Sequence, residues 1–235
     1  PAKEVGKLAR KYDAIFIVDG ISSVGGNEFL TDEWGIDIAI TGSQKCLAVP
    51  PGLAMVTVSK RAEEMLEKGK GGYYTDLEAH LDKAKKNQTP YTPAVSLFYA
   101  LQEALSMAAE EGFSERRARM AKLAKGVREA ASALEIELFP QVNEHSTYSN
   151  TVTAMKMPTG ITDGQLRGGM RKRGVVVSGG QSSLKGKIFR IGTMGACTES
   201  DVLRTIQTLE LVLEKEGVIP SLGAGVEAAS KAIDA

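Results

Sequence analysis

The chain has 235 residues, 43% of them apolar, and its 29 basic and 29 acidic side chains balance to a net charge of zero. This length and apolar content allow a substantial core in one large domain or two smaller ones. No cationic block predicts a nucleic-acid or anionic-membrane partner. No run approaches the roughly 18 apolar residues that span a bilayer, and the two cysteines, Cys46 and Cys197, have no metal or redox spacing. We therefore expect a soluble, cytoplasmic protein that acts on small molecules.

The first part of the chain alternates an amphipathic helix with short apolar strands. A helix is predicted over residues 1–11, and strands are predicted at 14–18, 36–41 and 53–58. The first two strands are near-continuous apolar runs, which are typical of strands covered on both faces in a mostly parallel sheet. The sequence thus predicts an α/β fold with ligands at the carboxyl ends of these strands.

Residues 60–86 are rich in charge and predict a surface excursion, after which apolar spacing predicts a long helix over 94–111. A domain boundary is expected near Gly112, so that residues 113–217 form a small α/β domain. In a βαβ-like order, this domain has a helix through 117–134, strands near 151–156, 175–177 and 188–191, and helices at 162–173 and 199–216. The tail at 218–235 is expected to be a weak helix or disordered.

Two predicted strands are followed by side chains that could react with or bind a small molecule, one a carboxylate and the other an amine. Asp19 directly follows the apolar run at 14–18. Lys45 is the last residue of the segment Thr41-Gly42-Ser43-Gln44-Lys45, which follows the second strand. A shielded amine is suited to condense with a carbonyl, most commonly that of pyridoxal 5'-phosphate (PLP), and a nearby carboxylate favours the protonated pyridine nitrogen of that cofactor. The plainer alternative is that Asp19 is a turn residue and Lys45 a surface charge.

The sequence motifs around both residues resemble those of the class V, fold type I, PLP-dependent aminotransferases. Residues 18–26 run Val-Asp-Gly-Ile-Ser-Ser-Val-Gly-Gly, and residues 41–54 join Thr-Gly-Ser-Gln-Lys to a trailing Pro-Pro-Gly. The closer similarity is to the alanine-glyoxylate or serine-pyruvate branch, because cysteine desulfurases of this class usually carry His where this chain has Gln44. The resemblance implies that residues 1–112 are the C-terminal part of a mostly parallel-sheet, PLP-binding large domain.

The resemblance also implies a role for each matching residue. Lys45 becomes the Schiff-base lysine and proton shuttle, and Asp19 becomes the partner of the pyridinium nitrogen. Ile21 becomes an apolar wall beneath the ring. Gln44 becomes a ligand of the cofactor phosphate or of its surroundings.

The segment Thr89-Pro90-Tyr91-Thr92-Pro93 resembles the part of the family sequence that reaches across a dimer interface. Thr92 is then the donor to the phosphate of the neighbouring subunit's cofactor, with Thr89 or Gln88 as alternatives. A threonine and a proline before a helix are equally what an N-cap needs, so that explanation of Thr92 stands beside the functional one.

Arg190 lies inside the apolar strand at 188–191, where a guanidinium needs a partner. Its planar fork matches a carboxylate, so the α-carboxylate of a substrate is a natural counter-ion, and the matching family motif assigns that role. A structural salt bridge is the alternative.

The resemblance therefore implies a cytoplasmic, homodimeric aminotransferase with shared active sites. It would transfer an amino group from alanine or serine to glyoxylate or pyruvate in two half-reactions. Because Pro1 is not a starting Met and the family's phosphate-binding turn would precede it, we expect an N-terminal portion to be absent or removed. Two alternatives stay open, namely a same-fold lyase or cysteine desulfurase, and an inactive fragment that retains only dimerisation.

Overall fold

The computed structural model describes residues 1–66 and 72–235, which form two compact units. The first unit comprises Pro1–Val24 and Phe29–Met107, and the second comprises Gly25–Glu28 and Ala108–Ala235. The short segment Gly25–Glu28, from the loop after the first strand, thus belongs to the second unit. Within the described ranges, no helix is both long enough and apolar enough to cross a bilayer.

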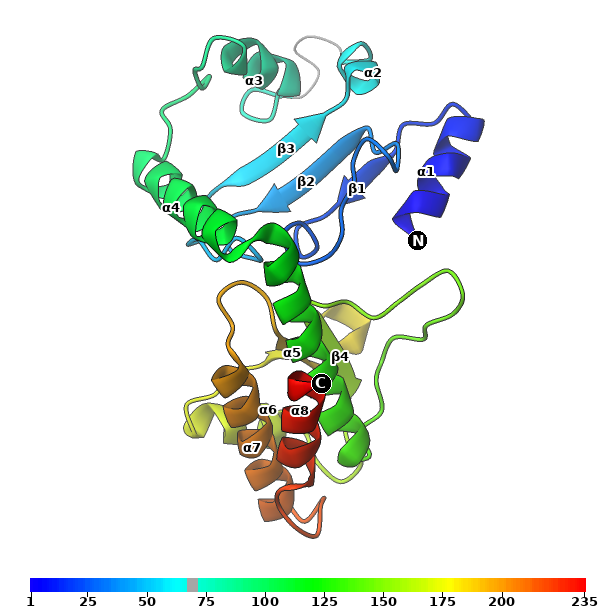
Figure 1. Cartoon of the computed structure of the whole chain (residues 1–235), viewed down its shortest axis with the longest axis vertical. Helices are drawn as coiled ribbons and strands as arrows, with labels where there is room; N and C mark the ends of the chain where they lie inside the picture. Colours follow the sequence, from blue (N-terminus) through cyan, green and yellow to red (C-terminus); the bar gives the residue numbers. More distant parts are fainter. Residues whose placement is uncertain (67–71) are drawn as a thin grey trace. The chain divides into compact units, whose positions relative to one another are not determined.

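The elements of the first unit follow the predicted order (Figure 1). They are α1 (Ala2–Lys11), β1 (Ile17–Asp19), β2 (Ile38–Gly42), β3 (Ala54–Val58), α2 (Lys60–Glu63), α3 (Leu77–Ala84) and α4 (Val95–Glu111), whose last turn the second unit shares. The strand predicted at 14–18 begins later than expected. The Ala14 N–H still donates to the Ala9 carbonyl at 2.8 Å, so the end of α1 occupies this stretch and Asp19 is the last residue of the strand.

β2 is the central strand of a three-stranded sheet with the order β1-β2-β3 (Figure 1). β1 runs parallel to β2, with Asp19 opposite Ile40, and β3 runs antiparallel to β2, with Met55 opposite Thr41. The α/β class is confirmed, and this part of the sheet has one parallel and one antiparallel pairing. Ile17 in β1 is 57% exposed, so the coverage on both faces that was predicted for this strand is not found within the described residues.

The predicted surface excursion at 60–86 contains the short helices α2 and α3, and its residues 67–71 lie outside the described residues. Each helix is capped by the side chain before it. The Ser59 hydroxyl accepts the Ala62 N–H at 3.1 Å, and the Asp76 carboxylate accepts the Glu78 N–H at 3.1 Å. α3 buries none of its residues, as expected for a surface segment.

The second unit combines a small sheet with longer helices (Figure 1). Its elements are α5 (Phe113–Ala133), β4 (Val152–Lys156), α6 (Asp163–Lys172), β5 (Ser178–Gly179), a 3₁₀ turn (Ser182–Leu184), β6 (Ile188–Gly192), α7 (Glu199–Lys215) and α8 (Ala224–Asp234). The sheet order is β4-β6-β5, and both pairings are antiparallel. The alternation of helices and strands is confirmed, but the βαβ-like arrangement is wrong because β4 and β6 run in opposite directions.

The strand predicted at 175–177 is displaced towards the C-terminus. The Val175 N–H donates to the Met170 carbonyl at 3.1 Å, so this valine belongs to the turn that ends α6. Val175 and Val177 are buried apolar residues, which explains their strand-like pattern, but pairing with β6 begins only at Ser178.

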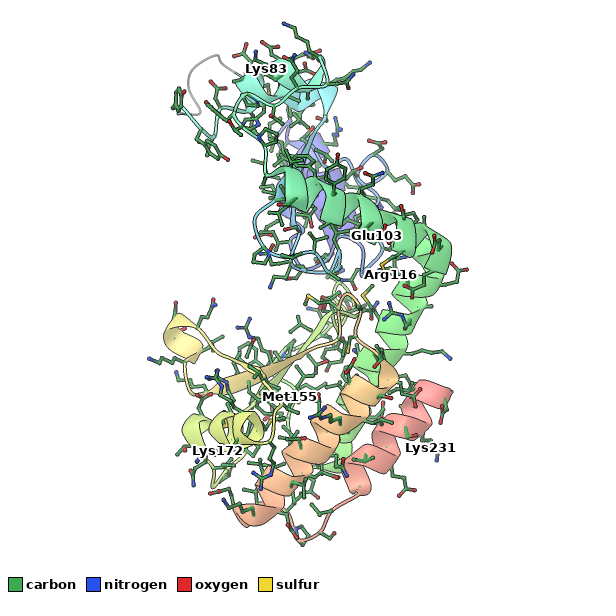
Figure 2. All side chains as sticks on the ribbon, turned by 90° about the vertical axis from the view of Figure 1, so that its left-hand side faces the viewer. Lys83, Glu103, Arg116, Met155, Lys172 and Lys231 are labelled. Atoms are coloured by element: carbon green, nitrogen blue, oxygen red, sulfur yellow. The ribbon has the colours of Figure 1, made fainter. Side chains whose placement is uncertain are left out.

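The core of the second unit lies between its sheet and helices α5, α6, α7 and α8. Met155, Phe189 and Leu213 are all 0% exposed. Figure 2 shows Met155 inside this unit and Lys172 and Lys231 on its outside. The apolar faces of the helices therefore close over the sheet.

Helix α8 resolves the two alternatives left open for the chain after Pro220, because residues 224–234 are helical and pack against α5. Its first turn is held by Glu210 of α7, a carboxylate that is 1% exposed. Glu210 accepts the N–H groups of Gly223 at 3.0 Å and Gly225 at 2.6 Å. Free N–H groups at a helix start favour a negative charge, so this buried carboxylate fixes α8 to the core.

Asp37, directly before β2, is a buried polar residue of the first unit and is 1% exposed. Its carboxylate accepts the Phe16 N–H at 2.9 Å, the Ser59 hydroxyl at 3.0 Å and the Arg61 guanidinium at 2.9 Å. Burial alone would raise the pKa of Asp37, but these hydrogen bonds and the charges of Arg61 and Arg10 leave the pKa below its usual value. One carboxylate thus joins the segment before β1, the sheet and α2.

We predict that Asp37→Ala lowers the free energy of unfolding at pH 7 by roughly 3 kcal/mol, because the Phe16 N–H, the Ser59 hydroxyl and Arg61 all lose a buried carboxylate acceptor. The lowered pKa makes this contribution complete above the unfolded-state pKa of about 3.9, and the contribution disappears as the pH falls through the folded-state value. Urea unfolding at pH 7 and pH 3 measures both effects. The exposed Asp32→Ala is the control and should change stability by less than about 0.5 kcal/mol. A loss for Asp37→Ala of equal size at both pH values would contradict this account.

Candidate active site

The parallel pairing of β1 with β2 brings two predicted site residues to the same edge of the sheet. Asp19 ends β1 opposite Ile40, and β2 ends shortly afterwards at Gly42. Lys45 lies in the next turn and is half-buried. Adjacent strands lie about 4.8 Å apart, so a carboxylate and an amine share the edge at which open α/β sheets bind ligands.

The Asp19 side chain is held by its own turn. Its Oδ1 accepts the Ile21 N–H at 3.0 Å, which fixes the carboxyl group relative to the backbone that follows. Within the described residues, Oδ2 has no hydrogen-bond partner, and the side chain is exposed. Ile21 is half-buried beside it. One carboxylate oxygen is thus fixed by the turn, and the other remains available to a ligand.

The turn that carries Lys45 is built around Ser43, which is 0% exposed. The Ser43 hydroxyl donates to the Pro50 carbonyl at 2.8 Å and accepts the Leu53 N–H at 3.2 Å. Its own N–H donates to the Leu53 carbonyl at 3.1 Å, and its carbonyl accepts the Val49 N–H at 3.0 Å. Four hydrogen bonds to one residue therefore close the loop and fix the backbone on which Lys45 stands.

The Pro-Pro-Gly segment after Lys45 allows close packing against α4. Gly52 has φ of 143°, a backbone conformation that side chains rarely adopt. A Cβ there would lie 2.5 Å from the Leu97 Cδ1 of α4. Glycine therefore allows the end of the Lys45 loop to lie directly against α4.

Cys46 joins the two loops that leave β1 and β2. The side chain is 1% exposed, and its Sγ donates to the Ser22 carbonyl at 3.6 Å. Because Ser22 follows Ile21 and Cys46 follows Lys45, this contact fixes the loops of both predicted site residues to one another. Burial makes Cys46 a packing residue of the site.

Gln44 is exposed, and its side chain folds back over the end of β2. A Cβ on Gly42 would lie 2.9 Å from the Gln44 Oε1, so glycine at this position gives the amide its room. The amide group therefore lies beside the strand end that Lys45 follows.

Thr92 is exposed and does not cap α4. The helix starts at Val95, and the Ala94 carbonyl accepts the first helical bonds, from Leu97 at 2.9 Å and Phe98 at 3.2 Å. Ala94 thus occupies the N-cap position, and the N-cap explanation of Thr92 is wrong. The Thr89 hydroxyl donates to the Tyr91 carbonyl at 2.6 Å and is used within its own turn.

Arg190 is half-buried on β6, and its guanidinium is held by a backbone oxygen. Nε and Nη2 both donate to the Gly179 carbonyl, at 3.0 and 2.8 Å. No ion pair joins Arg190 to an acidic residue of the described part of the chain. The structural salt bridge considered from the sequence is therefore not found there, and the positive charge has no counter-ion among these residues.

The structure brings four of the predicted site residues together at one edge of the first unit's sheet: Asp19, Ile21, Gln44 and Lys45. Thr92 lies in the same unit without a described contact to them, and Arg190 belongs to the second unit. Sequence reasoning missed Ser43, because a serine between two turn residues has no periodic signal. In residues 1–66 and 72–235, no group of three or more acidic, His or Cys side chains is arranged to hold a metal ion.

Comparisons with known proteins show what this chain is similar to. Residues 1–204 match the family described as aminotransferase class-V. An uncharacterised aminotransferase of Methanocaldococcus jannaschii is 48% identical over 221 residues, which cover 92% of this chain and 57% of the relative. The serine–glyoxylate aminotransferase of Arabidopsis thaliana is 36% identical, with 94% of this chain and 55% of the relative covered. Pyridoxamine-pyruvate aminotransferase from Mesorhizobium loti has a similar crystal structure, with a TM-score of 0.91 and 32% identity over 100% of this chain and 61% of that one.

We predict that Ser43→Ala lowers the free energy of unfolding by about 2 kcal/mol, because the Pro50 carbonyl and the Leu53 N–H both lose a buried partner. Urea unfolding measures the change. Ser183→Ala, which removes an exposed hydroxyl, is the matched control and should be nearly neutral. Equal effects of the two substitutions would show that the hydrogen bonds of Ser43 do not hold this turn.

Proposed function

We propose that this chain, which belongs to the class V aminotransferase family, carries the lysine and carboxylate of a PLP-dependent aminotransferase. The observation that supports this most directly is that Asp19 ends β1 and Lys45 lies in the turn after β2, the strand that pairs parallel with β1. The chain spans about 57% of the length of the Methanocaldococcus jannaschii relative. The activity, the substrates and the assembly of the whole protein are therefore all part of the proposal.

The residues present at this edge fit PLP. The half-buried amine of Lys45 is suited to bond with its aldehyde, and the unpartnered Oδ2 of Asp19 is suited to bind its ring nitrogen. Ile21, half-buried beside Asp19, offers an apolar surface to the ring, and the exposed amide of Gln44 offers donors to a phosphate. When bound, PLP supplies an electron-withdrawing ring that makes the α-hydrogen of an amino acid acidic.

The side chains of this chain then have separate tasks. Asp19 holds a proton on the ring nitrogen through its negative charge, and the Ile21 N–H keeps that carboxylate in place. Lys45, held by the Ser43 turn, accepts the α-proton on Nζ and returns it. Arg190 binds the α-carboxylate of the substrate and orients it. Thr92 donates to the phosphate of a neighbouring subunit's cofactor in a homodimer.

The substrates that we propose are a small amino acid, alanine or serine, and a 2-keto acid, glyoxylate or pyruvate. The names of the relatives support this class, since the Arabidopsis thaliana protein is a serine–glyoxylate aminotransferase. We place the reaction in the cytoplasm, because neither Cys46 nor Cys197 is in a disulfide, as is usual in reducing compartments.

A cysteine desulfurase of the same fold is the alternative activity, and two observations disfavour it. Cys46 is 1% exposed and hydrogen-bonded to a carbonyl. Burial, together with the nearby charge of Asp201, raises the pKa of the Cys197 thiol, so little of the nucleophilic thiolate forms at neutral pH. Release of alanine and sulfur from cysteine would favour the desulfurase, and amino transfer to glyoxylate would favour our proposal.

The direct test is reductive trapping on the full chain. One equivalent of PLP followed by borohydride should place a pyridoxyl group on Lys45, which peptide mass analysis locates. Lys45→Ala should abolish this label and the visible absorbance of the bound cofactor, and should lower any amino transfer by at least about 1,000-fold.

Lys60→Ala is the matched control, because it removes an exposed lysine from the same unit and should leave the label on Lys45. Labelling spread over exposed lysines, or absent altogether, would count against PLP binding by this chain and would favour the inactive-fragment alternative. Normal amino transfer by Lys45→Ala would overturn the role of this lysine.

A further inference from the structure

We propose that Arg167 is a positioning residue for Arg190. It supports the short strand β5, and the Gly179 carbonyl of that strand fixes the Arg190 guanidinium for a substrate carboxylate. This inference rests on the proposed function, in which Arg190 binds the α-carboxylate. It adds a second arginine and identifies the edge of Arg190 that the substrate meets.

The Arg190 guanidinium has one occupied edge. Nε and Nη2 donate to the same Gly179 oxygen, and the N–H groups of a guanidinium lie in one rigid plane. The edge formed by Nε and Nη2 therefore faces β5. Nη1 has no hydrogen-bond partner within the described residues, so the edge formed by Nη1 and the second N–H of Nη2 is available to both oxygens of a carboxylate.

The strand that supplies this oxygen is weakly held by the sheet alone. β5 has only the residues Ser178 and Gly179, and it lies at the edge of the order β4-β6-β5. Beyond it, the Gly180 N–H donates to the Ile188 carbonyl at 3.0 Å. Because the ladder is so short, the position of the Gly179 carbonyl depends on side-chain support from outside the sheet.

Arg167 of α6 gives that support. Its Nε donates to the Val177 carbonyl at 3.1 Å, and its Nη1 donates to Asp163 at 2.8 Å. The guanidinium also lies directly against Gly179, since a Cβ there would be 2.6 Å from the Arg167 Nη1 and 3.0 Å from its Cζ. The absence of a side chain at Gly179 thus lets one arginine rest on the backbone that a second arginine uses.

Asp163 fixes Arg167 in turn. The two residues are one helical turn apart on α6, and both side chains are 30% exposed. Lys172 marks the far end of this helix in Figure 2. A continuous set of contacts therefore runs from Asp163 through Arg167 and β5 to Arg190. A simple brace between α6 and β5 would affect stability alone, whereas a positioning role also affects carboxylate binding.

The test uses the full chain and the Arg167→Gln variant. Nuclear magnetic resonance follows the Arg190 Nε–H, which is identified by its absence in Arg190→Lys. We expect this proton to exchange with water about tenfold faster in Arg167→Gln, because its hydrogen bond to Gly179 is weakened. Arg171→Gln is the matched control, since it removes an exposed arginine from the same helix and should change nothing.

Carboxylate binding is measured by titration with pyruvate. The dissociation constant should rise about tenfold in Arg167→Gln, by the loss of roughly one charge-assisted hydrogen bond. Arg167→Lys should recover part of the affinity, because an ammonium keeps the charge but not the planar fork. In the PLP-loaded chain, KM for alanine should rise in Arg167→Gln while kcat changes by less than about twofold.

Unchanged Nε–H exchange in Arg167→Gln would overturn the positioning role, whatever the catalytic activity. Faster exchange with unchanged pyruvate affinity would also overturn it and leave a structural brace. Equal pyruvate binding by the wild-type chain and Arg190→Lys would instead refute the role of Arg190 in the proposed function. If Arg167→Gln does not fold, Gly179→Ala displaces the Arg167 guanidinium from the other side and must show the same changes.

Discussion

The parallel pairing of β1 with β2 is the constraint on which the candidate site depends. It places the end of one strand beside the end of the next, so that Asp19 and the loop of Lys45 lie at a common edge. Apolar runs specify the two strands, but they do not fix the loops. That task belongs to the buried Ser43 and to the contact between Cys46 and the Ser22 carbonyl. The positions of the two loops at this edge are therefore fixed by turn residues that make no contact with a substrate in our proposal.

Most elements of the fold are predictable from the sequence, because their causes are local. Apolar residues predict a helix at 94–111 and a strand at 36–41, and the folded chain has a helix and a strand there. Strand direction has a different origin. β2 and β3 are joined by the tight loop at 43–53, which has no room for the crossover helix that parallel strands require. The antiparallel pairing thus follows from loop length, a signal that apolar periodicity does not carry.

The candidate site divides in the same way. Asp19 directly follows an apolar run and Lys45 lies in the turn after another, so their pattern predicts a shared edge. Ser43 and Arg167 have no such signal, because each acts on backbone carbonyls that only the folded chain brings within reach. Thr92 shows the opposite error, since its sequence context suits an N-cap, whereas the helix starts at Val95. Local patterns predict the groups that do chemistry better than the groups that hold them in place.

The two units contribute different kinds of preorganisation. In the first, hydrogen bonds within the loops fix the Asp19 carboxylate and the backbone that carries Lys45, so the positions of these loops do not wait for a ligand. In the second, Arg190 has its charge held by a neutral carbonyl instead of by an acidic residue. A carboxylate that bound there would meet an oriented guanidinium with an uncompensated charge, and it would displace no internal ion pair. Since a buried ion pair costs affinity when it must be broken, a backbone oxygen is the better support for an arginine that binds and releases acids in each catalytic cycle.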